Sequence, residues 1–155
     1  MPDLDCYFCK KLAVLDTLAA DEVVGRLQHS IVLLGPWQYY QGYCIVVARR
    51  HAAELSHLSD AERTAFLDEM CRVARAIEQE FRPRKLNCEL LGNQVPHLHW
   101  HVFPRYVDDP DVLKPVWLAL DRAERDEAER RRLQNGILPR SDIAERLRKR
   151  LTSDL

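Results

Sequence analysis

Three of the six histidines of the chain alternate within five residues, at His97, His99 and His101. The residues between them, Leu98 and Trp100, are apolar. Side chains two residues apart share one face of a strand, whereas a helix would turn them by about 200° at each step. The pattern therefore predicts a strand that presents three imidazoles on one face and packs apolar side chains on the other.

Imidazole titrates near neutral pH, and it can act as a nucleophile, a proton carrier or a metal ligand. Each ring has two nitrogens that need partners when it is buried, so three buried rings without a function would be costly. The alternative is a set of exposed strand histidines with no role. We favour a functional site, because the alternation is predicted to line the three rings along one surface.

A second group of reactive side chains lies near the start of the chain, where Cys6 and Cys9 form a Cys-x-x-Cys motif in an aromatic, polar segment. In a reducing compartment such a pair is more often half of a metal site or a redox pair than a structural disulfide. A thiol oxidoreductase is disfavoured, because the pair does not follow a strand in a βαβ pattern. Cys44, Cys71 and Cys88 lie in apolar segments, and we expect them to be buried.

The elements that must position these groups can be predicted from the spacing of apolar residues. Strand-like composition and alternation occur in five segments: 22–27, 31–34, 43–49, 85–91 and 97–103. A long helix is predicted between Ser59, which forms a capping box with Glu62, and Pro83. Several strands with one long helix, and no βαβ alternation, are typical of an α+β fold with a mainly antiparallel sheet.

The end of the chain differs in composition, because 18 of the last 35 residues are charged, 10 of them basic and 8 acidic. Helices are predicted over 116–133 and from Ser141 onward, the second with Ile143, Leu147 and Leu151 on one stripe. We therefore divide the chain into a domain that carries the histidines, residues 1–115, and a charged helical extension of the same domain, residues 116–155.

Composition also bears on partners and location. The 155 residues are 46% hydrophobic and 30% charged, with a net charge of −1, which is typical of one globular domain. This charge gives no general attraction to nucleic acid or to an anionic membrane, and no apolar run approaches the roughly 18 to 20 residues of a membrane span. The first residues lack the basic and apolar regions of a secretory signal. We expect a cytoplasmic protein that binds neither nucleic acid nor membrane.

The histidine motif is similar to that of a known family. The segment from His97 to Phe103 resembles the His-φ-His-φ-His-φ-φ signature of the histidine triad (HIT) hydrolases and nucleotidyl transferases, in which φ is apolar. Weaker similarities in the Cys-x-x-Cys motif, in residues 47–62 and in residues 104–106 extend the resemblance over about residues 4–107. It implies a five-stranded antiparallel sheet with one long helix in a catalytic domain, and a symmetric homodimer. The implied reaction is attack on the α-phosphate of a dinucleoside polyphosphate, such as diadenosine tetraphosphate, or of a nucleoside phosphoramidate.

The same resemblance implies roles for single residues and makes the three triad histidines the catalytic residues. His99 is implied to be the nucleophile that forms a nucleotidyl-histidine, while its other ring nitrogen donates to a backbone carbonyl. His101 is implied to hold a non-bridging phosphate oxygen as charge develops. Asn93 and Gln94, in the loop before the triad, and Asn87 are implied to bind the substrate. The alternative for Asn93 and Gln94 is plain turn chemistry.

Family members with an N-terminal Cys-x-x-Cys bind a structural zinc ion, and here the implied ligands are Cys6, Cys9, His51 and His97. Two thiolates and two imidazoles would make a closed tetrahedral site without an open position for water. Such a site would hold the N-terminal segment against the sheet and orient the catalytic strand through His97. No organic cofactor is implied.

Two positions depart from the family pattern. The acidic residue that usually holds the ribose hydroxyls aligns near Gly35, and the Gly-His that usually opens the central strand is Gly42-Tyr43. The sequence therefore assigns no ribose-binding residue. The aromatic residues of segment 37–40 offer stacking surface for a base, although packing in the core or in a dimer explains them equally well.

Two further functions remain open. In the first, all three triad histidines bind a catalytic zinc ion, as histidines at alternate strand positions can do. The Cys6 and Cys9 thiols are better candidate metal ligands, however, and no nearby carboxylate base is evident. In the second, the chain is a nucleotide-binding or interaction module without significant turnover, which the missing acidic residue favours.

Overall fold

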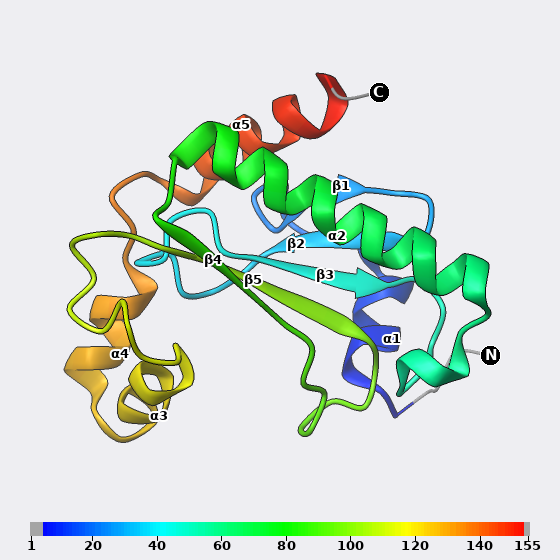
Figure 1. Ribbon diagram of the computed structural model, residues 1–155, viewed down its shortest axis with the longest axis horizontal. Helices are drawn as coiled ribbons and strands as arrows, with labels where there is room; N and C mark the ends of the chain where they lie inside the picture. Colours follow the sequence, from blue (N-terminus) through cyan, green and yellow to red (C-terminus); the bar gives the residue numbers. More distant parts are fainter. Residues whose placement is uncertain (1–4, 154–155) are drawn as a thin grey trace.

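The computed structural model describes residues 5–153, which form one five-stranded sheet with helices on both faces (Figure 1). Neighbouring strands are antiparallel, in the order β1-β2-β3-β5-β4. The strands are β1 (Val23–Arg26), β2 (Ser30–Leu34), β3 (Cys44–Ala48), β4 (Lys85–Glu89) and β5 (His99–Arg105). The predicted α+β fold with a five-stranded antiparallel sheet is confirmed.

The helices differ widely in length. Those of the described residues are α1 (Tyr7–Ala13), η1 (Leu15–Thr17), η2 (Leu55–His57), α2 (Asp60–Phe81), α3 (Trp117–Arg125), α4 (Glu127–Gln134) and α5 (Arg140–Ser153). The longest, α2, begins at the predicted capping box, where the Ser59 amide donates to the Glu62 carboxylate over 2.9 Å. It ends at Arg82, whose φ of 50° turns the chain out of the helix just before Pro83. None of the described helices is both long and apolar enough to cross a bilayer.

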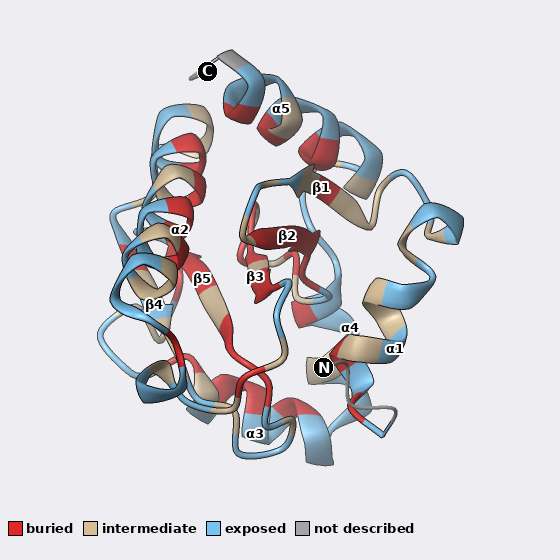
Figure 2. Cartoon of the chain, turned by 90° about the vertical axis from the view of Figure 1, so that its right-hand side faces the viewer, coloured by how far each residue is buried: buried red, intermediate tan, exposed pale blue. Residues whose placement is uncertain are grey.

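The alternation of side chains along the strands places one apolar cluster on the first face of the sheet and two on the second. Figure 2 shows buried residues along the strands and on parts of the surrounding helices. On the first face, Val46 of β3 and Val102 of β5 pack against α2, and α5 completes this layer. Trp100 of β5 packs against the same layer. The apolar residues between the histidines thus pack opposite the imidazoles, as the alternation predicts.

Two separate groups of helices cover the second face, on which the side chains of His99 and His101 lie. At one end Phe8 of α1 packs with buried side chains of β2 and β3. At the other end Leu120 of α3 and Leu133 of α4 pack around Phe103. The histidines therefore lie between α1 and the first helix of the C-terminal extension.

The C-terminal extension has more structure than the sequence predicts. The expected stripe of α5 is confirmed, because Ile143, Leu147 and Leu151 are all buried, and α5 contacts α2 and β1. The single helix expected over 116–133 is instead two helices, α3 and α4. Asp126 separates them in an extended conformation, and its carboxylate caps α4 by accepting from the Ala128 amide at 2.8 Å.

Other local expectations are corrected. β5 begins at His99 rather than at His97, because the Leu98 amide is bonded to the Ala52 carbonyl outside the ladder, at 2.8 Å. The short helix α1 was not predicted. Cys71 and Cys88 are exposed and not buried: Cys71 lies on the solvent side of α2, and Cys88 lies on β4, an edge strand.

Candidate active site and metal site

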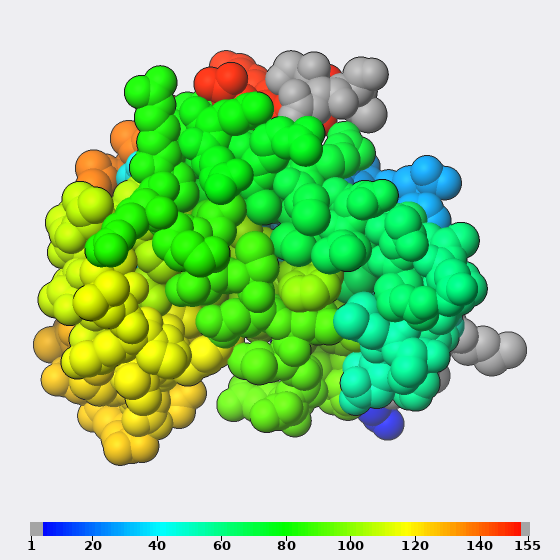
Figure 3. Space-filling model, in the orientation of Figure 1, coloured from blue at the N-terminus to red at the C-terminus, as the bar shows by residue number. Residues whose placement is uncertain are grey.

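His99 and His101 form part of the floor of a cleft of about 520 Å³. Residues of α1, of α3 and of the loop 91–95 also line the cleft. In Figure 3 this loop and the α3 segment stand side by side at the lower edge of the molecule. The cleft is thus built from both the triad domain and the C-terminal extension, because α3 contributes Trp117, Leu120 and two carboxylates to its wall.

The partner of one ring nitrogen fixes the protonation of His99. Its Nδ1 lies 2.6 Å from the carbonyl oxygen of His97. A carbonyl only accepts, so Nδ1 must carry the hydrogen, and in the neutral ring the lone pair is on Nε2. Burial lowers the pKa of His99 below its usual value, which keeps the ring neutral near pH 7. The centroids of the His99 and Phe8 rings are 4.7 Å apart, and His99 lines the cleft. The ring is thus neutral, with a lone pair on Nε2, as a nucleophile requires.

His101 lies beside His99, with the two ring centroids 4.8 Å apart. Burial, followed by the charge of His99, lowers the pKa of His101 to about 4. Its Nδ1 lies 2.7 Å from the hydroxyl of Tyr43, and its ring is nearly perpendicular to the Trp117 ring, with the ring centroids 5.1 Å apart. The cleft therefore holds two neutral imidazoles in contact, both anchored through Nδ1.

His97 is turned away from this pair towards the Cys-x-x-Cys motif. The ligand atoms of Cys6, Cys9, His51 and His97 all lie within 4.8 Å of one another, and they are the metal-ligand cluster found among the described residues. The Nδ1 atoms of His51 and His97 are 3.3 Å apart, and the Cys6 Sγ is 3.4 Å from the His97 Nδ1. In a tetrahedral zinc site, normal bond lengths place two nitrogens about 3.3 Å apart and a sulfur and a nitrogen about 3.5 Å apart. The residues present therefore fit zinc.

A second contact supports the same conclusion. The Nε2 of His97 lies 2.7 Å from the carbonyl oxygen of Ala48, to which it must donate. The lone pair of the neutral ring is then on Nδ1, the atom that faces the thiols. Metal-binding histidines usually donate their other N–H to a carbonyl or carboxylate in this way. Only His97 of the triad belongs to this cluster, which does not favour a catalytic zinc ion bound by all three histidines.

Two of the three side-chain amides predicted to bind substrate line the cleft, and the third does not. Asn93 and Gln94 are exposed on the loop before the triad, and both line the cleft. Asn87 does not line it, because its Oδ1 accepts from the buried guanidinium of Arg105 at 3.0 Å. Arg105 is in turn paired with Asp109 at 2.7 Å, so Asn87 is part of a structural network at the end of β5.

Sequence reasoning missed several residues around His101. The indole Nε1 of Trp117 donates to the carboxylate of Glu89, which lies directly opposite His101 in the β4–β5 register. No local pattern marks either residue, because they meet only through the sheet register and the docking of α3. The one available signal was Tyr43, which stands where the family has histidine.

The two departures from the family pattern have one structural cause. A methyl carbon built on Gly35 would lie 2.8 Å from Cγ of the Tyr43 ring and closer still to Cδ1 and Cε1. Carbon atoms normally stay about 3.5 to 4.0 Å apart. The Tyr43 ring thus occupies the space that a side chain at position 35 would need, so a tyrosine at 43 requires a glycine at 35.

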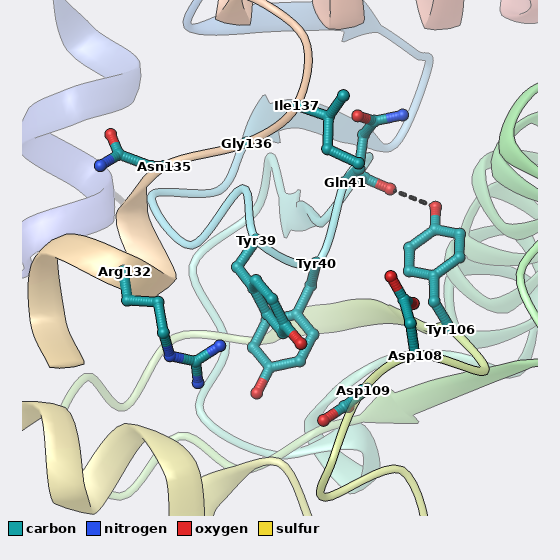
Figure 4. Close-up of a pocket in the computed structure, with 10 residues that line it drawn as sticks. All are labelled: Tyr39, Tyr40, Gln41, Tyr106, Asp108, Asp109, Arg132, Asn135, Gly136 and Ile137. Atoms are coloured by element: carbon teal, nitrogen blue, oxygen red, sulfur yellow. Dashed lines mark hydrogen bonds between the residues drawn. The ribbon is translucent and has the colours of Figure 1, made fainter.

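A second cavity, of about 440 Å³, lies outside the triad cleft (Figure 4). Tyr39 and Tyr40 from the loop before β3 lie opposite Arg132 of α4, and Asn135 at the end of α4 also lines the cavity. Much of its polar lining is already paired within the protein. The Arg132 guanidinium binds Glu129 and lies over the Tyr39 ring at 4.4 Å from its centroid. The Tyr106 hydroxyl donates to the Gln41 carbonyl at 2.7 Å, while the Oε1 of Gln41 has no partner among the described residues.

Comparison with known proteins agrees with this geometry. The model of the HIT domain family matches residues 17–108. The relative "Protein hit" of Bacillus subtilis is 30% identical over 118 residues, which are 73% of this chain and 79% of that protein. "AP-4-A phosphorylase" of Mycobacterium tuberculosis is 30% identical over 95 residues, 57% of this chain and 48% of that protein.

Solved structures show the same fold. A histidine triad protein of Bradyrhizobium japonicum superposes with a TM-score of 0.56 at 28% identity, covering 73% of this chain and 92% of that one. A Zn-bound histidine triad family protein of Mycobacterium smegmatis superposes with a TM-score of 0.68 at 18% identity, covering 97% and 95%. With His99 and His101 on one face of the sheet and a family match over most of the chain, this protein is a member of the histidine triad family.

Proposed function

We propose that the chain is a nucleotidyl-phosphate hydrolase that attacks the α-phosphate of a nucleotide through His99. The substrate is a dinucleoside polyphosphate, such as diadenosine tetraphosphate, or a nucleoside phosphoramidate. The observation that carries the proposal is the hydrogen bond from the Nδ1 of His99 to the His97 carbonyl, because it leaves a lone pair on Nε2. The relative named for AP-4-A, which shares about half of its length with this chain, supports the substrate class.

The proposed reaction has two steps. The Nε2 of His99 first bonds to the α-phosphorus while the bond to the leaving group breaks, and the leaving group departs with the bonding electrons. Water then attacks the same phosphorus and loses a proton to solvent, and the bond to Nε2 breaks with its electron pair returning to the ring. The nucleoside monophosphate is released and His99 is restored. His101 and the amides of Asn93 and Gln94 donate hydrogen bonds to the phosphate oxygens as they gain charge. We keep the cytoplasmic location and the homodimer as parts of the same proposal.

We also propose that Cys6, Cys9, His51 and His97 hold a structural zinc ion. The distances among their ligand atoms and the protonation of His97 support this, and a neighbour of the same fold is described as Zn-bound. The ion would supply no chemistry to the reaction and would hold four ligands in one rigid group. The residues themselves would then tie α1 to the start of β5, which fixes Phe8 against the ring of His99.

The test is a comparison of wild-type protein with His99→Ala on diadenosine polyphosphates and adenosine phosphoramidate. We expect kcat to fall at least about a thousandfold, as is usual when covalent catalysis is removed. His57→Ala, an exposed histidine outside the cleft, is the matched control and should keep full activity. Mass spectrometry after rapid acid quench should detect the nucleotidyl group on wild-type protein only. Equal rates for wild type and His99→Ala would refute the nucleophile assignment.

A second candidate function is nucleotide binding without significant turnover. The observation in its favour is that Tyr43 excludes any side chain at position 35, near which the family's usual ribose-binding acid aligns. This candidate predicts tight binding of a nucleoside monophosphate by calorimetry, no product from any substrate of the panel, and the same affinity in His99→Ala.

A further inference from the structure

The hydroxyl of Tyr43 makes the contact that decides what His101 can do. It lies 2.7 Å from Nδ1 of His101, and the side chain of Tyr43 is almost fully buried, with 2% of its surface exposed. Either group could donate in this hydrogen bond. If Tyr43 donates, the neutral His101 carries its hydrogen on Nε2. If His101 donates, its Nε2 is a bare lone pair.

The lack of a second protein partner for the hydroxyl favours one of the two directions. If the Nδ1 of His101 donated, the hydroxyl hydrogen of Tyr43 would need another acceptor. Among residues 5–153, the one hydrogen-bond partner of that hydroxyl is the Nδ1 of His101, and the Tyr43 side chain borders the cleft with 2% of its surface exposed. A buried donor without an acceptor is costly, whereas an unused lone pair on a hydroxyl oxygen costs less. The hydroxyl also keeps its hydrogen at neutral pH, because burial raises the pKa of Tyr43 well above its usual value.

We propose that Tyr43 is a positioning residue that donates to the Nδ1 of His101 and so holds the His101 hydrogen on Nε2. His99 then offers a lone pair at its Nε2, and its neighbour offers an N–H. The two imidazoles of the cleft are thereby given opposite roles, one to bond with phosphorus and one to hold an oxygen of the phosphate. The consequence for rate rests on the proposed function, but the placement of the hydrogen does not.

The packing around Tyr43 keeps this contact in place. Its ring stacks on Phe103 with centroids 3.8 Å apart and planes 10° apart, and Phe103 follows His101 on the same face of β5. The backbone pairs the residue after Tyr43 with Val102 in the β3–β5 ladder. Gly35 leaves the space that the ring fills. The hydroxyl therefore has little freedom to leave His101.

The direct test is nitrogen NMR of ¹⁵N-histidine-labelled protein at pH 7 without substrate. The His101 signals are assigned by their loss in His101→Gln. We expect an unprotonated Nδ1 and a protonated Nε2 in wild type, and a mixture of the two forms in Tyr43→Phe. A protonated Nδ1 in wild type would overturn the proposal. The wild-type spectrum carries the result, and the His101→Gln variant is needed only to assign the two His101 signals.

The kinetic test compares Tyr43→Phe with Tyr40→Phe, on the panel used for the proposed function. Tyr40 is the matched control, because it is equally buried and also packs on Phe103 but does not touch a histidine. We expect kcat of Tyr43→Phe to fall about threefold to tenfold with little change in KM, the effect of weakening one hydrogen bond in the transition state. Tyr40→Phe should match wild type. Equal kcat for Tyr43→Phe and wild type would overturn the proposed effect of Tyr43 on the rate. Activity that survives His99→Ala would instead refute the proposed function, and it would leave the NMR result for His101 unaffected.

Discussion

Placing a single methyl group at position 35 should destabilise the protein by collision with Tyr43. Gly35 does not have a positive φ, so alanine meets no backbone penalty there. The added carbon would lie 2.8 Å from the ring Cγ and nearer to two other ring carbons, about 1 Å or more inside normal contact. The ring cannot move away, because it is stacked on Phe103 at 3.8 Å. Overpacking of this kind costs about 1–3 kcal/mol.

We therefore expect the unfolding midpoint of Gly35→Ala to fall by about 3–10 °C in a chain of this length. Gly25→Ala is the matched control, because its added carbon would come 3.1 Å from the terminal Cδ1 of Leu151 and would meet Val32 only at the ordinary contact distances of 3.6 and 3.8 Å. Both changes restrict the unfolded chain equally, so the difference between them isolates the collision. We expect the control to stay within about 1 kcal/mol of wild type.

The collision can be separated from other effects by a double-mutant cycle in urea. Tyr43→Ala alone should cost about 3–5 kcal/mol, as large-to-small changes of buried aromatic residues do. In that background, adding Gly35→Ala should cost less than about 0.5 kcal/mol, because the ring is gone, which gives a coupling energy of about 1–3 kcal/mol. Additive free energies of unfolding would refute the reasoning and separate the two departures from the family pattern.

Three other perturbations test the metal site, the titration of His101 and the charge of the cleft. In protein purified without chelator, Cys9→Ser should reduce bound zinc from about one equivalent to less than half, as measured by metal analysis. It should also lower the unfolding midpoint measured by calorimetry. A full equivalent of zinc in the variant would contradict the ligand set. The unfolded chain takes up a proton at His101 below about pH 6.5, whereas the folded chain does so only near pH 4. The free energy of unfolding should therefore fall as the pH decreases from about 6.5 to 4, and urea titrations should show a smaller fall for His101→Gln. The same fall in wild type and variant would contradict the lowered pKa of His101. Replacing the carboxylates of Asp121 and Glu124 with amides should raise kcat/KM for a polyanionic substrate about twofold to fivefold at low salt and less at high salt; no change would place the bound phosphates away from α3.

The sequence predicts the parts of this fold that depend on local periodicity. Alternation places His99 and His101 on one face of β5, and the capping box marks the start of α2 at Ser59. The break between α3 and α4 was missed, because Asp126 caps a helix inside a run of residues that all favour helices. The exposure of Cys71 was missed because it depends on which side of α2 faces solvent, a matter of tertiary packing.

The three triad histidines show why site chemistry is harder to predict than fold. They are identical residues at regular spacing, yet each ring is fixed by a different partner: His97 by a carbonyl at the end of β3, His99 by the carbonyl two residues before it, and His101 by a hydroxyl at the start of β3. Only the partner of His99 is local, and its role is the one that the motif alone predicts. The other two partners come from opposite ends of the strand that pairs with β5. Their roles are therefore set by the β3–β5 register, in which Ile45 lies opposite His101, and a shift of one residue along that ladder would exchange them for other groups.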